Sequence, residues 1–227
     1  MAWRSHGRDN TSLVENLEKN SIIKSDRVKT AMLSVDRGNY VDRHPYEDAP
    51  QRIGFNITIS APHMHAHALQ ILRKQLKPGC SALDVGSGSG YLTACMSDMV
   101  GPSGKVVGID HIQELVEHSI ENIKKDGKGN MLSTSQITMV VGDGREGWEE
   151  EGPYDCIHVG AAAPSLPPAL TNQLKPGGRM VIPVGPEGGR QTLDMVEKDM
   201  EGKVTRSQLM GVVYVPLCDK KHQMNKN

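Results

Sequence analysis

The sequence predicts an α/β protein with a doubly wound, largely parallel sheet, and two stretches support this prediction most directly. Leu83–Gly90 runs from apolar residues into three glycines at alternate positions, and an amphipathic run begins directly afterwards at Tyr91. Lys105–Asp110 is a second strand-like run that ends in an acid about 20 residues further along. Strand, tight glycine turn, helix and strand make up a βαβ unit, which places its two strands parallel in one sheet.

Residues 1–78 are predicted to form a helical cap and a segment that reaches the ligand site. Ser12–Glu15 has the pattern of a capping box, so the first helix is expected to begin at Ser12. Ser25 is placed to begin a second helix that continues to Val35. The other expected elements of this part are a loop over 39–50, a short strand at 53–55 and a helix from Pro62 to Leu76.

Residues 79–227 are predicted to form the ligand-binding sheet and the helices that cover it. Apolar runs of strand length alternate with helical patterns, and the final strands follow one another closely. We therefore expect a seven-stranded, largely parallel sheet with an antiparallel edge, in one domain that spans 1–227. The expected strands are 81–86, 105–110, 137–141, 156–159, 179–184, 192–198 and 210–215, and the expected helices are 91–100 and 112–125.

The composition argues against several kinds of partner and compartment. Lys and Arg number 26 against 27 Asp and Glu, so the net charge of −1 does not favour binding to nucleic acid or to an acidic membrane. Aromatic residues make up only 4%, which disfavours a base-stacking surface. The four cysteines form no C-x-x-C pair, and the N-terminus lacks the apolar core of a signal peptide. We therefore expect a cytoplasmic protein with neither nucleic acid nor membrane as a partner.

The spacing of the glycine loop favours S-adenosyl-L-methionine (SAM) over a dinucleotide. A dinucleotide fingerprint has a further glycine where this sequence has Tyr91, and here the spacing is G-x-G-x-G with Asp84 before the first glycine. SAM has no pyrophosphate and instead carries a sulfonium and an amino-acid tail, and Asp110 is placed to bind ribose hydroxyls. The alternative is a nucleotide-type loop that has lost its ligand site.

Two further clusters each have two interpretations. Gly142 and Asp143 follow the third strand, where the carboxylate either accepts a hydrogen bond from an adenine amino group or belongs to a plain turn. His63 and His67 share a helix face, but no H-E-x-x-H pattern or cysteine accompanies them, so we expect no metal site. His65 lies off that face and is a candidate for orienting a carboxylate of the substrate or the cofactor.

Ser60 is the candidate for the reacting end of the site. It lies outside any G-x-S-x-G elbow, which argues against a nucleophilic serine. It directly precedes a proline-initiated helix, so its hydroxyl is placed to donate a hydrogen bond to an anionic group near the helix N-terminus.

The run Thr58–Met64, Thr-Ile-Ser-Ala-Pro-His-Met, closely resembles protein-L-isoaspartate (D-aspartate) O-methyltransferase, and most closely the animal cytosolic form. This run is more specific than the glycine loop, because other SAM enzymes lack it. The likeness extends from about the first helix to Pro216. The other stretches that carry it are 83–90, 108–111, 141–145, 154–164, 174–189 and 209–217.

The resemblance implies a repair enzyme with the seven-stranded, Rossmann-like fold of SAM-dependent methyltransferases. SAM would methylate the α-carboxylate of L-isoaspartyl residues, and less well that of D-aspartyl residues, in damaged proteins and peptides. The ester would then close to a succinimide without the enzyme, and hydrolysis would return some normal aspartate. Ser60 is implied as the active-site serine, and no obligate protein partner is implied. The implied cofactor contacts are Ile57, Thr58, Ile59, Ser60, His65, Asp84, Gly86, Gly88, Ser89, Gly90, Asp110, Gly142, Asp143 and Gln223.

Two departures from the family pattern concern the C-terminal contacts. Cys218 stands where a threonine is expected, and the tail from Asp219 matches poorly. Two other functions remain as alternatives. One is a non-catalytic adaptor that recognises damaged peptides, and the other is a methyltransferase for small molecules or RNA. The residues that resemble cofactor contacts argue against the first, and Thr58–His63 and the neutral charge argue against the second.

Overall fold

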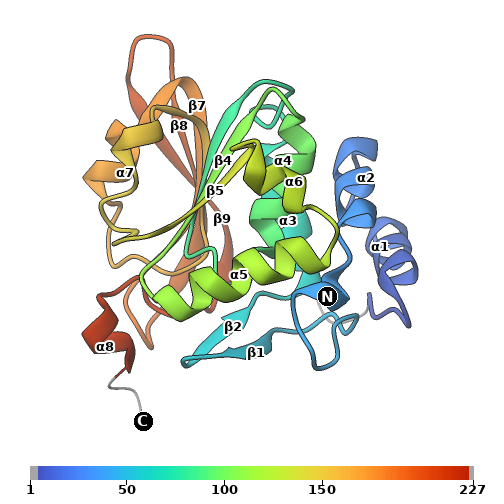
Figure 1. The fold of residues 1–227 in the computed structure, drawn as a ribbon. Coiled ribbons are helices and arrows are strands. Elements are labelled where there is room, and N and C mark those ends of the chain that lie inside the picture. The colour runs from blue at the N-terminus through green and yellow to red at the C-terminus, as the bar shows by residue number, and fades with distance from the viewer. Residues whose placement is uncertain (1–4, 225–227) are drawn as a thin grey trace.

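The computed structural model describes residues 5–224, which form one seven-stranded sheet with helices packed against it (Figure 1). In the order β5–β4–β3–β6–β7–β8–β9, the first five strands are parallel and the last two continue the sheet antiparallel. The predicted fold class is confirmed, while both ends of the predicted domain, 1–4 and 225–227, lie outside the described residues. The strands are β3 (Ser81–Val85), β4 (Lys105–Asp110), β5 (Ile137–Val141), β6 (Tyr154–Val159), β7 (Leu174–Val184), β8 (Gln191–Lys198) and β9 (Val204–Val212).

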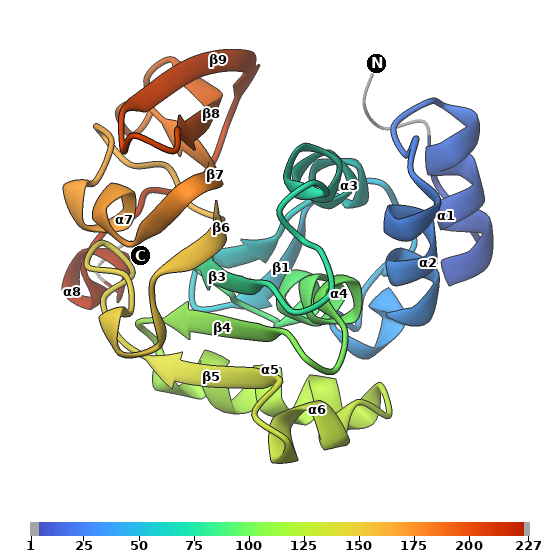
Figure 2. The same ribbon diagram turned by 90° about the horizontal axis from the view of Figure 1, so that it is seen from above.

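Helices cover the two faces of the sheet unequally, as Figure 2 shows from above. One face packs against α3 (Pro62–Leu72), α4 (Tyr91–Val100) and α5 (Gln113–Lys125), with α1 (Asn10–Lys19) and α2 (Asp26–Ser34) as an outer layer. The other face carries the short α7 (Pro168–Asn172). Short elements that the sequence pattern did not predict are α6 (Gly129–Ser133), α7, α8 (Lys220–Met224) and the 3-10 turns η1 (Arg37–Asn39) and η2 (Glu149–Glu151).

Neighbouring residues of the central strands belong to different apolar clusters. In β3, Ala82 packs into the cluster that contains the cap helices, whereas Leu83 packs into the cluster on the opposite face. Val106 and Val107 of β4 divide in the same way. Since successive side chains of a strand point to opposite faces, a strand covered on both faces becomes apolar throughout. This explains why the runs 81–86 and 105–110 were recognisable without alternation.

The two predictions that differ most from the structure concern β7 and β9. Strand β7 begins at Leu174, five residues before the predicted start at Arg179, because Leu174 pairs with Tyr154 before the register shifts. Strand β9 covers Val204–Val212, whereas the predicted strand is 210–215. Residues 204–209 of this edge strand are all exposed, so they lack the apolar alternation that marks a half-buried strand.

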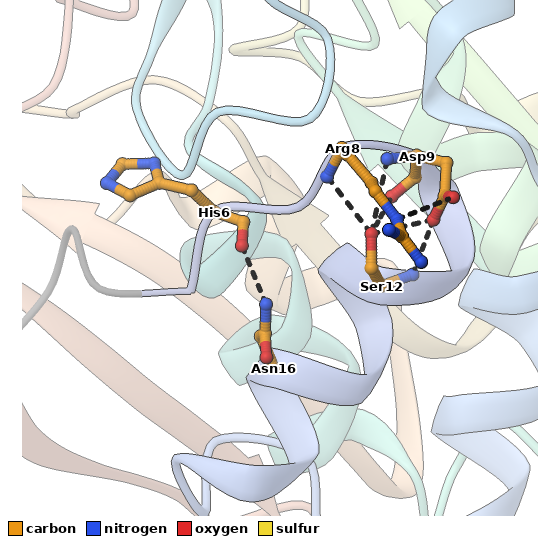
Figure 3. A network of polar contacts seen from close by, with 5 residues as sticks. All are labelled: His6, Arg8, Asp9, Ser12 and Asn16. Carbon is orange, nitrogen blue, oxygen red and sulfur yellow. Dashed lines mark hydrogen bonds and ion pairs between the residues drawn. The ribbon is translucent and has the colours of Figure 1, made fainter.

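The first helix begins earlier than the capping-box pattern indicated, and Figure 3 shows why. Asp9 is the N-cap and accepts a hydrogen bond from the backbone N–H of Ser12 at 2.8 Å, while Ser12 Oγ accepts one from the Asp9 N–H at 3.2 Å. Asn16 also donates to the carbonyl of His6 at 2.7 Å. The prediction of a helix start at Ser12 is therefore wrong, because Ser12 takes the third helical position and Asp9 takes the capping role. The second helix follows Ser25 as predicted.

A hairpin of β1 (Gln51–Gly54) and β2 (Ile57–Ile59) leads into α3 and lies beside the ligand-binding end of the sheet (Figure 1). Phe55 and Asn56 connect the strands with positive φ angles of 50° and 57°. Turns of this kind match the twist of a hairpin. Helix α3 ends at Leu72, four residues before the predicted end, and Leu76 reaches the core from the turn that follows. Among the described residues, no helix is both long and apolar enough to cross a membrane.

Candidate active site

A cavity lies at the carboxyl ends of β3, β4 and β6, where the chain reverses its direction of travel across the sheet. Ligands of open α/β sheets bind at this position. The cavity holds about 800 Å³ of space between atoms, including the solvent at its mouth. The predicted site residues that line it are Ile57, Thr58, Ile59, Ser60, His65, Asp84, Gly86, Gly88, Ser89, Asp110 and Gln223.

The glycine loop passes close to the carboxylate at the end of β4. Gly88 has a φ of 50° and donates its N–H to Asp110 at 3.1 Å, and Ile112 donates to the other carboxylate oxygen at 3.1 Å. Burial raises the pKa of Asp110, and these two backbone N–H groups oppose that rise. Ser87 Oγ lines the same wall, is buried and has no hydrogen-bond partner among the described residues. A polar ligand with hydroxyl and amino groups therefore fits this wall.

Asp84 has a different environment from Asp110. Thr93 Oγ1 donates to one carboxylate oxygen at 2.6 Å, and His158 Nδ1 lies 2.8 Å from the other. Asp84 is only 1% exposed, and these two contacts engage both of its carboxylate oxygens within the protein. It therefore orients His158, which also lines the cavity. His158 is not among the predicted site residues, although it is a single histidine inside the apolar run 156–159, which is a signal for a functional residue.

Ser60 lies between the end of β2 and the start of α3, and it is partly buried. Its hydroxyl is a hydrogen-bond partner of Tyr214, whose pKa is raised to about 12 by burial and lowered in part by that bond. The N-cap of α3 is Ala61 and no side chain caps this helix. The Ser60 hydroxyl is therefore available for a role other than helix capping.

Arg37 supports this segment from η1, and nothing in the sequence pattern singled it out. Its Nη2 donates to the Ser60 carbonyl at 2.7 Å, and its Nη1 lies 3.2 Å from His65 Nδ1. Both Arg37 and His65 are buried, with 0% and 7% of their surface exposed. One cap residue thus contacts two residues of the predicted site.

The other two histidines of α3, His63 and His67, are not among the residues that line the cavity. His63 Nδ1 lies 2.7 Å from Asp48 Oδ1, and its backbone N–H also donates to Asp48 at 3.0 Å. Burial lowers the pKa of His67. Within residues 5–224, no three histidine, cysteine or acidic side chains are grouped as a metal site.

Three predicted contacts do not line the cavity. Gly90 has a φ of 82° at the N-cap of α4, and a Cβ there would lie 3.0 Å from Ser119 Cβ. A Cβ at Gly142 would lie 2.9 Å from Ile109 Cδ1. Asp143 accepts two hydrogen bonds from Arg145 Nε, at 2.9 and 3.0 Å, and Arg145 is the largest cause of its lowered pKa. The left-handed backbone favours glycine at position 90, and the Ile109 side chain leaves little room for a Cβ at position 142. The cofactor roles of all three residues stay predictions.

The C-terminal segment folds over the cavity, and α8 lies at the same end of the sheet as the β1–β2 hairpin (Figure 1). Gln223 is 2% exposed and donates from Nε2 to the carbonyls of Phe55 and Asn56, at 3.1 and 3.3 Å. Cys218 Sγ lies 3.6 Å from Gln223 Oε1. The amide thus joins α8 to the hairpin turn.

The family model for protein-L-isoaspartate (D-aspartate) O-methyltransferase matches residues 8–222 of this chain. The protein-L-isoaspartate O-methyltransferase of Caenorhabditis elegans is 51% identical over 227 residues, which is the full length of both chains. Protein-L-isoaspartate O-methyltransferase 1 of Arabidopsis thaliana is 52% identical over 217 residues, covering 95% of this chain and 94% of that protein.

A solved structure is similar in fold as well as in sequence. The protein-L-isoaspartate O-methyltransferase of Plasmodium falciparum, crystallised in complex with S-adenosyl-L-homocysteine, superimposes with a TM-score of 0.87. It is 40% identical, and the match covers 93% of this chain and 99% of that chain.

Proposed function

The chain belongs to the protein-L-isoaspartate (D-aspartate) O-methyltransferase family, and from this we propose its reaction. It transfers a methyl group from SAM to the free α-carboxylate of L-isoaspartyl residues in damaged proteins and peptides, and less efficiently to D-aspartyl residues. One observation carries the proposal: a single cavity is lined by the glycine loop, by Asp110 and by Ser60. A site for an adenosine-containing donor and a hydroxyl for the acceptor thus share one space.

SAM, when bound, supplies a methyl group activated by a positively charged sulfonium. Gly86, Gly88 and Ser89 provide backbone that a ligand can approach closely, and the Asp110 carboxylate is positioned by two backbone N–H groups to accept from ribose hydroxyls. Ile57, Thr58, Ile59 and His65 line the same cavity, and Gln223 joins α8 to the hairpin turn beside it. Asp84 contributes through His158.

Gly90, Gly142 and Asp143 do not line the cavity, but they belong to the proposed cofactor site because they lie beside it. Gly90 begins α4 and shapes the loop before it. Gly142 and Asp143 follow β5 at the same end of the sheet. A cofactor contact to the Asp143 carboxylate requires that this group share or leave its hydrogen bonds to Arg145.

The acceptor needs positioning more than activation. A model aspartate carboxyl titrates at about 3.9, so the acceptor is already an anion near neutral pH and needs no general base. Alignment of two bound reactants can by itself supply roughly 7–11 kcal/mol. Ser60 donates a hydrogen bond that holds the acceptor carboxylate, and it forms no covalent intermediate.

A methyl-transfer assay with matched peptides tests this function. Peptides of one sequence carry L-isoaspartyl, D-aspartyl or L-aspartyl at one position, and labelled SAM is the donor. We expect isoaspartyl to be preferred over aspartyl by on the order of 100-fold, because one methylene moves the carboxylate by about 1 Å. Equal methylation of both peptides would contradict the isoaspartyl assignment. Peptide binding without any methyl transfer would instead identify an adaptor.

We also propose that the protein works as a monomer of one domain in the cytoplasm, on isoaspartyl-containing proteins and without an obligate protein partner. Its two apolar clusters lie on the two faces of one sheet, which supports a single domain. Light scattering of active protein tests the monomer, and cell fractionation tests the compartment. Activity that sediments with membranes, or that requires a dimer, would contradict this.

A further inference from the structure

Arg37 is a buried cation in the cap, and its contacts are unusual for one. The side chain is completely buried, and it forms no ion pair with a carboxylate within residues 5–224. It donates to the Ser60 carbonyl, contacts His65 Nδ1 and lies over the Tyr91 ring at 5.3 Å from its centre. Its Nε has no hydrogen-bond partner among those residues. The Asp48 carboxylate acts on the guanidinium only from beyond ion-pair distance. Burying a charge that forms no ion pair is costly, so a role in the fold alone accounts poorly for it.

The chemistry of arginine determines how His65 is protonated. A guanidinium has five N–H donors and no acceptor. Since Arg37 Nη1 lies 3.2 Å from His65 Nδ1, that nitrogen has to accept the hydrogen bond. The proton of a neutral His65 then resides on Nε2, and the ring presents a donor there.

We propose that Arg37 is a positioning residue that sets two members of the site at once. Through Nη1 it holds the proton of the neutral His65 ring on Nε2. Through Nη2 it holds the Ser60 carbonyl and thereby the segment that carries the Ser60 hydroxyl. This rests on the proposed function, in which His65 and Ser60 face the anionic groups of the cofactor and the substrate.

The groups that surround His65 agree with a neutral ring. Burial lowers its pKa well below the ordinary value, and Arg37 from η1, His158 from β6 and His63 from its own helix act in the same direction. A further titratable neighbour is the Tyr91 phenol on α4, whose ring centre lies 5.1 Å away and whose pKa is raised well above its ordinary value by burial. None of these groups is a carboxylate that would favour protonation of His65. Its Nε2–H is therefore a neutral donor, suited to orient a carboxylate.

Nitrogen-15 NMR of the histidine rings in the unmodified protein is the first test, and His65→Gln assigns the signal. We expect His65 to show one tautomer, protonated on Nε2, from about pH 5.5 to 8.5, on both sides of the ordinary histidine value of about 6.5. Titration of His65 within that interval, or a proton on Nδ1, would overturn the proposal. This measurement needs no substrate, so it stands whether or not isoaspartyl peptides are methylated.

Arg37→Met and Arg37→Lys then separate positioning from folding. Arg37→Met removes the charge and both donors, so we expect mixed tautomers of a His65 ring that burial still keeps neutral. Arg37→Lys keeps the charge and a donor, and we expect a neutral His65 with its proton on Nε2. For methyl transfer to isoaspartyl peptide we expect kcat of Arg37→Met to fall by on the order of 100-fold, as for a reacting group misplaced by about 1 Å, and Arg37→Lys to recover part of it.

Arg27→Met is the matched control. Arg27 also donates to backbone carbonyls, those of Arg73, Leu76 and Met99, but it does not line the cavity. We expect the His65 spectrum and kcat to be unchanged in this variant. An unchanged His65 tautomer in folded Arg37→Met would overturn the proposal, and so would equal His65 changes in Arg27→Met.

Discussion

Asp84 and His158 occupy paired positions on the neighbouring parallel strands β3 and β6, and their side chains meet with 2.8 Å between Oδ1 and Nδ1. The two residues are 74 positions apart in the sequence. Both are buried at the floor of the cavity, where β3 leads into the glycine loop. The pair therefore connects the stability of the central strands to the shape of the site.

Replacing Asp84 with asparagine tests this connection. Asp84→Asn removes the charge from a buried acceptor of two side-chain donors, so we expect a loss of about 1.5–3 kcal/mol in the free energy of unfolding. Denaturant unfolding measures it. Glu18→Gln is the matched control, since Glu18 pairs with Lys29 at 2.6 Å on the surface, where solvent screens the pair and a much smaller loss is expected. Equal losses in both variants would contradict a special role for the buried pair.

Asp110→Asn tests the carboxylate at the end of β4. The amide oxygen can still accept from Gly88 or Ile112, but the charge that strengthens hydrogen bonds from ribose hydroxyls is lost. We expect S-adenosyl-L-homocysteine to bind less tightly by about 1.5–3 kcal/mol, measured by calorimetry. Unchanged affinity would remove Asp110 from the cofactor site. A parallel thermal melt checks that the glycine loop remains folded.

Ser60→Ala separates substrate orientation from structure. Because α3 is capped at Ala61 without a side chain, we expect the melting temperature to fall only by what the lost hydrogen bond to Tyr214 contributes, about 1 kcal/mol. We expect kcat for isoaspartyl peptide to fall strongly, while affinity for S-adenosyl-L-homocysteine changes much less. Ser60→Thr keeps the hydroxyl and should retain part of the activity. Near-normal turnover with a lowered melting temperature would make Ser60 a structural residue.

Gln223→Ala tests the closure of the C-terminal segment over the cavity. The change removes two hydrogen bonds to the hairpin turn, each contributing about 1 kcal/mol, so we expect roughly 30-fold weaker binding of S-adenosyl-L-homocysteine. Stopped-flow measurement should place the change mainly in the dissociation rate. Lys221→Ala, at an exposed position of the same helix, should leave both unchanged. Equal effects of the two variants would mean that α8 acts only through its overall packing.

Several parts of the molecule could be predicted because their signals are local. The helix 91–100 and the strands 105–110 and 137–141 have the observed bounds, since their apolar runs and glycine boundaries are contained in short windows. The start of α1 was misplaced because serine and aspartate can both cap a helix, and only the backbone of Asp9 decides which does so. Strand β9 was misplaced because an exposed edge strand has no buried face to set its pattern.

The sequence by itself determined the βαβ unit, the glycine loop and the acid at the end of the second strand, because each depends on the conformation of neighbouring residues. Only the tertiary structure decided how Ser60 and His65 are held. Arg37 reaches them across 23 and 28 positions, from a cap turn that no periodicity marks. It also decided that Asp84 is engaged by Thr93 and His158. Such contacts join side chains from separate elements, and their partners are defined only when those elements pack together.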